Sequence, residues 1–131
     1  MTTNHCLITG VGTVRVPVAD QARAVHFYTD KPGFEVRADL PYLEDERWIE
    51  LAPPGAKTTI AIVVPGGPDP IQPGGYGQVI FATSDVDATH AELMERGVEV
   101  DHVFTPPGGA GAQMFFFRDA DDNRLLIVER D

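Results

Sequence analysis

The sequence predicts an α+β fold built from two copies of one strand-helix-strand-strand-strand module. Two observations carry this prediction. The segment VRVPVADQARAVHFYTDKPGFEV, residues 14–36, has the pattern of a strand, an acid-capped helix, a tight turn and a second strand. The segment DVDATHAELMERGVEV, residues 85–100, repeats the cap, helix, glycine and Glu-Val, with Asp20 and Asp85 65 residues apart. A repeat of about half the chain length indicates a duplicated supersecondary unit.

The first module is expected over about residues 10–64. Valines at alternate positions from Val14 to Val18 predict a strand over residues 11–18, with Pro17 restricting it to an edge or to its last residues. Asp20 caps a helix over residues 20–30, which places apolar residues on one stripe. Strands follow at 34–40, 47–52 and 57–64, and residues 41–46 are predicted to be an acidic loop. The strand at 57–64 is apolar on both faces, so we expect both faces to be covered.

The second module is expected over about residues 76–130, after a linker at 65–75 that is rich in Pro and Gly. Its predicted elements are a strand at 77–82, a helix at 86–96, a strand at 98–104, a loop at 105–111, and strands at 113–118 and 125–129. We expect one domain over residues 1–131, since this length buries a sizeable core.

Composition narrows the possible functions. The chain is 43% hydrophobic and 23% charged, which is typical of a globular protein. No run approaches a membrane helix, and the N-terminus MTTNHC does not resemble a secretory signal. Cys6 is the only cysteine, which favours a reducing cytoplasm. The net charge of −10 argues against nucleic acid and anionic membranes; it suits a cationic ligand, or merely keeps the surface soluble.

Three familiar motifs are not supported. The acidic turn at 119–123 lacks the Gly and Glu of a calcium loop, since Arg124 and Arg130 occupy those positions. The TPPGGAG loop lacks the Lys and Ser/Thr of a phosphate-binding loop. The four histidines are expected away from any common site: His5 in the tail, His26 exposed and His90 half-buried on the helices, and His102 in a strand whose outer residues are solvated.

The module order, together with VPVADQARAVHFYTDKPGFEV, RWIELAPPG, DVDATHAELMERGVEV and FFFRDADDNRLLIVER, resembles the vicinal oxygen chelate superfamily over about residues 11–130. That superfamily includes glyoxalase I, extradiol dioxygenases and bleomycin-resistance proteins. The resemblance implies that the two sheets curl around a cavity, usually in a homodimer. It also implies a metal site, whose four positions here are Thr13, Ala61, Gln78 and Leu126. Because Ala61 and Leu126 have no donor atom, we expect no metal and no cofactor.

The predicted ligand-binding residues are the remaining candidates for the cavity wall. Strand alternation places Thr13 and Arg15 on it, and places Trp48 and Glu50 there if Ile49 and Leu51 face the helices. Trp48 offers a stacking surface for a flat or cationic ligand. Alternatively, Trp48 packs in the core or a dimer interface, and Arg15 and Glu50 pair with each other. The full predicted set is Thr13, Arg15, Trp48, Glu50, Ala61, Gln78 and Leu126.

We therefore expect a metal-free protein that binds a small organic molecule, with sequestration of a toxic or cationic compound as one role. The alternative is a glyoxalase-like lyase, isomerase or dioxygenase acting in the same cavity, which would need either a metal bound by residues not predicted here or metal-free acid–base chemistry by Glu50. A third reading is a dimeric structural or regulatory module without a ligand.

Overall fold

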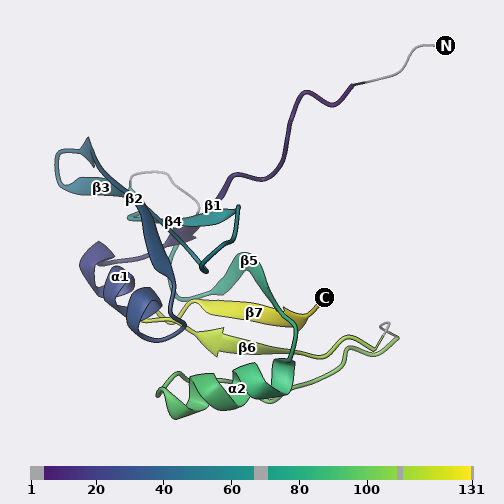
Figure 1. The fold of residues 1–131 in the computed structure, drawn as a ribbon. Helices are drawn as coiled ribbons and strands as arrows, with labels where there is room; N and C mark the ends of the chain where they lie inside the picture. The colour runs from purple at the N-terminus through teal and green to yellow at the C-terminus, as the bar shows by residue number, and fades with distance from the viewer. Residues whose placement is uncertain (1–4, 67–70, 109–110, 131) are drawn as a thin grey trace.

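A computed structural model describes residues 5–66, 71–108 and 111–130. Within these residues the chain forms two helices and two sheets (Figure 1). The first sheet has the strand order β1-β4-β3-β2, comprising β1 (Thr13–Pro17), β2 (Glu35–Leu43), β3 (Glu46–Ala52) and β4 (Thr59–Val63). The second has the order β5-β7-β6, comprising β5 (Tyr76–Thr83), β6 (Met114–Arg118) and β7 (Arg124–Glu129). The predicted α+β class is confirmed.

The 65-residue repeat is visible in the strand register. In the first sheet β1 runs parallel to β4 and Arg15 lies opposite Ala61. In the second sheet β5 runs parallel to β7 and Ile80 lies opposite Leu126, each 65 residues further along. The two sheets are therefore built on the same internal pairing.

The two helices, α1 (Gln21–Asp30) and α2 (Val86–Glu95), begin in the same way. The carboxylate of Asp20 accepts a hydrogen bond from the backbone N–H of Arg23 at 3.1 Å. Asp85 does the same for Ala88 at 3.0 Å. Each acid satisfies a backbone donor that the first helical turn leaves unpaired, as predicted from the sequence.

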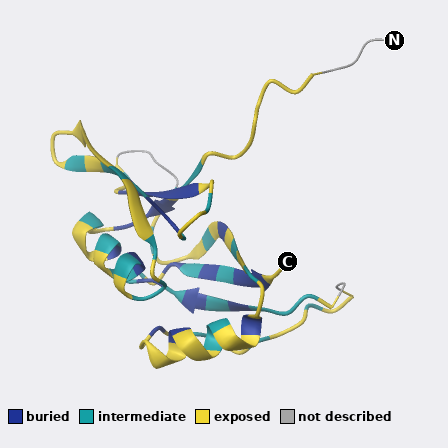
Figure 2. Ribbon diagram, viewed as in Figure 1, coloured by how far each residue is buried: buried dark blue, intermediate teal, exposed yellow. Residues whose placement is uncertain are grey.

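The predicted loop at 41–46 is wrong. Strand β2 continues to Leu43, and only Glu44 and Asp45 form the turn to β3. Pro41 is tolerated because β2 is an edge strand, where a missing N–H need not break a ladder. The pairing of β2 with β3 shifts register between Val36 and Ala38 and again between Pro41 and Leu43. Figure 2 shows that β2 is exposed along most of its length.

The predicted strand at 98–104 is also wrong. This segment pairs with β6 only at two isolated antiparallel bridges, Val100 with Phe117 and Phe104 with Met114. The pairing slips by one residue between the two bridges. The core-directed residues are Val98, Val100 and Val103, a spacing that breaks the alternation of a regular strand.

A single core cluster connects the two modules. It contains helix residues from both halves, such as Tyr28 and Leu93, and residues from the helix-facing sides of both sheets, such as Leu51 and Phe117. All five residues of β4, which lies between β1 and β3, are buried, as expected from its apolar sequence. The opposite sides of the sheets carry most of the exposed apolar side chains of the strands.

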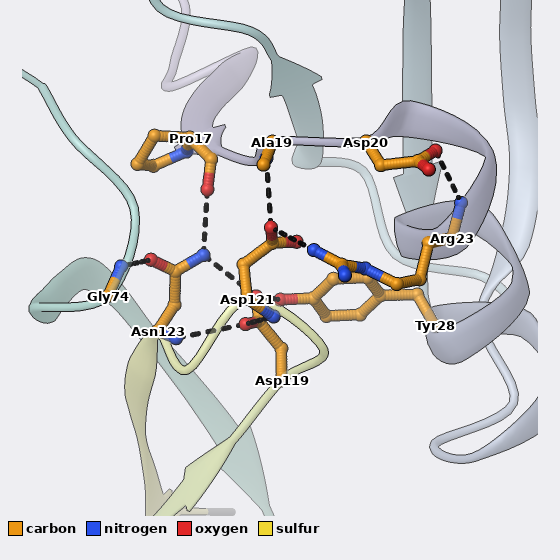
Figure 3. A network of polar contacts seen from close by, with 9 residues as sticks. All are labelled: Pro17, Ala19, Asp20, Arg23, Tyr28, Gly74, Asp119, Asp121 and Asn123. Carbon is orange, nitrogen blue, oxygen red and sulfur yellow. Dashed lines mark hydrogen bonds and ion pairs between the residues drawn. The ribbon is translucent and has the colours of Figure 1, made fainter.

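A buried polar network connects the β6–β7 turn to the first module (Figure 3). Asp119 accepts hydrogen bonds from the hydroxyl of Tyr28 at 2.7 Å and from the amide of Asn123 at 2.9 Å. That amide also donates to the carbonyl of Pro17 at 2.7 Å. Asp121 accepts from the backbone of Ala19 and from Arg23, both at 2.8 Å. The acidic turn is thus a structural link between the modules.

Part of the predicted linker, residues 67–70, lies outside the described residues, as do Gly109 and Ala110 of the predicted 105–111 loop. Neither helix in the described part of the chain is long and apolar enough to cross a membrane.

Candidate functional site

A polar cluster lies on the face of the first sheet that is turned away from the core, and Glu50 of β3 is at its centre. The indole N–H of Trp48 donates to Glu50 Oε2 at 2.6 Å. The hydroxyl of Thr59 donates to Oε1 at 2.7 Å, and that of Thr13 at 3.4 Å. The two threonine hydroxyls are 2.8 Å apart. Glu50 therefore fixes side chains from three neighbouring strands.

Strand pairing explains why these groups meet. The parallel ladder between β1 and β4 places Thr13 directly opposite Thr59. The antiparallel ladder between β3 and β4 places Glu50 opposite Ala61. Along β3, Ile49 and Leu51 point into the core cluster, so Trp48 and Glu50 share the opposite face. This is the strand register expected from the sequence.

Glu50 is held in its charged form. Its pKa is lowered, chiefly by the hydrogen bond from Trp48 and then by that from Thr59, with a smaller effect from Thr13. Partial burial acts in the opposite direction but is outweighed. A carboxylate that accepts several hydrogen bonds is stabilised as the anion and becomes a weaker base.

Trp48 forms an aromatic corner with Tyr42 of β2. The two ring centroids are 5.8 Å apart and the planes meet at 65°, an edge-to-face arrangement. Tyr42 is 57% exposed and Trp48 is half-buried. Sequence reasoning missed Tyr42 because residues 41–46 were predicted to be an acidic loop. The two-residue spacing of Leu40 and Tyr42, which continues the preceding strand, was the available signal.

The other predicted site residues are divided between the two sheets. Arg15 is exposed on β1 beside the fully buried Ala61, whereas Gln78 and Leu126 lie on the second sheet. A hollow of about 380 Å³ is lined by Gln78 together with Thr59. A second, of about 410 Å³, is lined by Gln78 and the start of β5. Neither hollow is lined by Trp48 or Leu126.

The chain matches the family model described as the Glyoxalase/Bleomycin resistance protein/Dioxygenase superfamily over residues 4–127. It belongs to this superfamily. The predicted resemblance is thereby confirmed, and the fold described above is that of its solved members.

Two solved structures illustrate the similarity. The antibiotic-binding protein TnmS3 from Streptomyces sp. CB03234 is 36% identical, with a TM-score of 0.82 over 97% of this chain and 100% of that one. A superfamily member from Sphaerobacter thermophilus DSM 20745 is 32% identical, with a TM-score of 0.85 over 95% and 100%. Among curated sequences, YetH of Bacillus subtilis (strain 168) is 32% identical over 94% of this chain and 100% of its own length.

The metal positions implied by the glyoxalase superfamily do not suit a metal in this chain. They fall on Thr13, Ala61, Gln78 and Leu126, and the methyl and isobutyl groups of Ala61 and Leu126 provide no donor. Thr13 is already engaged with Thr59 and Glu50. Nowhere among the described residues do three or more His, Cys, Asp or Glu side chains gather in a way that could hold a metal ion.

Proposed function

We propose that this glyoxalase-superfamily protein binds a small organic molecule on the open face of the first sheet, without a metal, and that it acts by sequestration. The observation that carries the proposal is the arrangement of Trp48, whose indole is fixed by Glu50 and flanked edge-on by Tyr42. A rigid, half-exposed aromatic surface beside a carboxylate is typical of a site for a flat guest. The similarity to the antibiotic-binding TnmS3 supports this choice of function.

The guest that best suits this site is planar and positively charged. A cation over an indole gains roughly 0.5–2 kcal/mol. Glu50 adds a fixed negative charge next to the ring, and the protein as a whole carries a net charge of −10. Both effects favour a cationic guest over a neutral one of the same shape.

The alternative activity, a glyoxalase-like lyase, isomerase or dioxygenase, is less well supported by this geometry. A general base works best with a pKa near the working pH. The pKa of Glu50 is instead lowered, and hydrogen bonds from Trp48, Thr59 and Thr13 already occupy its oxygens. This arrangement is better suited to positioning an indole than to removing a proton from a substrate.

Fluorescence quenching tests the binding proposal, because Trp48 is the only tryptophan. We expect N-methylquinolinium, a planar cation, to quench Trp48 saturably at pH 8 and to bind more tightly than neutral quinoline. Glu50→Gln should weaken binding of the cation and leave the affinity for quinoline nearly unchanged. Glu95→Gln, on the exposed surface of α2, should change neither affinity. Equal effects of the two glutamine variants, or no saturable quenching by any planar cation in a broad screen, would contradict the proposal.

Metal independence requires a separate measurement. Purified protein from metal-supplemented medium should contain no stoichiometric Zn, Ni, Fe or Mn, because the implied ligand positions lack donors. Elemental analysis gives the answer directly. One such metal per chain, displaced by substitution at Thr13 or Gln78, would show that the site is metal-dependent after all.

We further propose a homodimer that covers exposed strand edges and leaves both open sheet faces accessible to ligands. β2 is an edge strand of the first sheet and is exposed along most of its length, so its unpaired backbone groups need a partner. Light scattering at micromolar concentration should give about twice the 14.2 kDa chain mass. A mass near 14.2 kDa would argue against pairing.

A further inference from the structure

The open face of the second sheet has a different chemistry from that of the first. Its residues form rows across the three strands, set by the ladder registers. The first row is Tyr76, Arg124 and Arg118; the second is Ile80, Leu126 and Phe116; the third is Ala82, Val128 and Met114. Along β6 and β7 successive rows are about 7 Å apart, since residues two apart on a strand share a face. On β5 a register shift lies between Tyr76 and Ile80, the residues of the first two rows. A cationic row therefore borders an apolar surface.

Arg118 and Arg124 lie directly opposite one another on antiparallel strands. Like charges in this position destabilise a sheet. Arg118 is compensated by Glu99, which it contacts at 2.9 Å. In contrast, Arg124 forms no salt bridge with any residue that the structure describes. Its Nη1 donates to the hydroxyl of Tyr76 at 2.9 Å, and its guanidinium carbon lies 5.1 Å from the centre of that ring.

The surroundings of Arg124 leave room for a ligand. A hollow of about 380 Å³ is lined by Gly74, Gly75, Tyr76, Arg118, Asp122 and Arg124. The two glycines bring only backbone to its wall. The acidic turn between β6 and β7 is fixed by the buried network of Asp119, so the two arginines are carried on a rigid support.

An aromatic surface begins at the edge of this hollow. The rings of Tyr76 and Phe116 are 5.3 Å apart and meet edge to face. Phe104 stacks on Phe116 at 6.1 Å. Tyr76 is 65% exposed and Ile80 is 59% exposed, so this surface is accessible. A guanidinium that lies next to exposed aromatic rings favours a ligand with a carboxylate at one end and a flat apolar body.

We propose that Arg124, held over the ring of Tyr76 and hydrogen-bonded to its hydroxyl, is the anion-binding group of a second site that takes aromatic carboxylates on the open face of the second sheet. The guanidinium forms a bidentate pair with the carboxylate, and the aromatic body lies along Tyr76, Ile80 and Phe116. Asp122 lines the same hollow, and both it and the net negative charge of the protein oppose anions, so recognition depends on the bidentate pairing with Arg124. This site lies on the second sheet, whereas Trp48 lies on the first, and the proposal does not depend on the function proposed for Trp48.

Titration of the full-length chain with 2-naphthoate, followed by NMR chemical shifts, tests the proposal. We expect shifts along β5, β6 and β7, with little change at the indole N–H of Trp48, and weaker binding of the neutral isostere 2-naphthamide. Arg124→Ala should lower the affinity for 2-naphthoate by about tenfold or more, because a charge-assisted hydrogen-bonded pair is lost. Arg124→Lys keeps the charge but loses the fork, so it should give a smaller but clear loss.

Arg130→Ala is the matched control, since it removes one exposed positive charge from the same module. Its affinity for 2-naphthoate should stay within about twofold of the parent chain. Several results would overturn the proposal. They are no binding at millimolar concentration, equal losses from Arg124→Ala and Arg130→Ala, equal affinities for the acid and its amide, or binding that is abolished by Trp48→Ala. If Arg124→Ala does not fold, the Arg124→Lys comparison with Arg130→Ala decides the question.

Discussion

Asp119 and Glu50 each organise a cluster of hydrogen bonds, and the two clusters differ in what surrounds them. Asp119 is 5% exposed and accepts hydrogen bonds from the backbone and a side chain of its own turn and from the Tyr28 hydroxyl of α1. Glu50 is only partly buried, on a sheet face without covering helices, and three of its partners are side chains that reach over that face. A buried carboxylate with saturated hydrogen bonds specifies a fold, whereas a partly exposed one is available to a ligand.

The comparison predicts the largest stability effect at Asp119. Asp119→Ala removes the acceptor of the Tyr28 hydroxyl and of the backbone N–H of Asn123, both of which stay buried. We expect a loss of about 3–5 kcal/mol of unfolding free energy, since each unsatisfied buried donor costs about 1–3 kcal/mol. Urea denaturation measures it, with Glu95→Ala as the exposed control. A loss of unfolding free energy no greater than that of the control would show that this cluster does not stabilise the fold.

The next largest expected effect is a loss of stability at high pH that depends on Tyr28. Burial raises the pKa of Tyr28 well above its ordinary value, and the neighbouring Asp119 adds to this. The unfolded chain therefore loses the Tyr28 proton first, so the stabilising effect is complete below about pH 10 and is lost as the pH rises further. Tyr28→Phe should unfold with a shallower dependence on pH above 10. Parallel pH profiles for the two proteins would contradict the assignment.

Glu50 should show a smaller effect at low pH. Its pKa is lowered, so a cationic guest should remain bound as the pH falls below the range in which ordinary glutamates protonate. Affinity is then lost as the pH falls through the lowered pKa. Trp48→Phe removes the largest cause and should raise the pKa of Glu50, as followed by NMR of its carboxyl carbon. An unchanged pKa in this variant would show that the indole hydrogen bond is absent in solution.

Sequence periodicity was sufficient for the elements whose apolar spacing is regular. The helices with their Asp20 and Asp85 caps, the repeat and the face of β3 that carries Trp48 all followed from local rules. The segment 98–104 was mispredicted because Val98, Val100 and Val103 face the core through an interrupted register, which depends on β6. The extension of β2 past Pro41 depends on its place at a sheet edge, which a local pattern does not encode.

The candidate site could be predicted only where it depends on local alternation along one strand. Alternation along β3 placed Trp48 beside Glu50, but the hydroxyl of Thr59 joins them only through the β1–β4 pairing. Tyr42 and Arg124 were missed, because their significance lies in contacts across strands with Trp48 and Tyr76. Cross-strand chemistry becomes visible only when the register is known.

The most direct test measures affinity and stability together in two variants, Glu50→Gln and Tyr28→Phe. We predict that Glu50→Gln weakens N-methylquinolinium by about tenfold, equivalent to 1.4 kcal/mol, while the free energy of unfolding changes by no more than about 1 kcal/mol. Tyr28→Phe should lower the free energy of unfolding by about 1.5–3 kcal/mol and leave the affinity unchanged. If Glu50→Gln instead destabilises the fold without affecting binding, Glu50 is a structural residue and the open face of the first sheet is not the binding site.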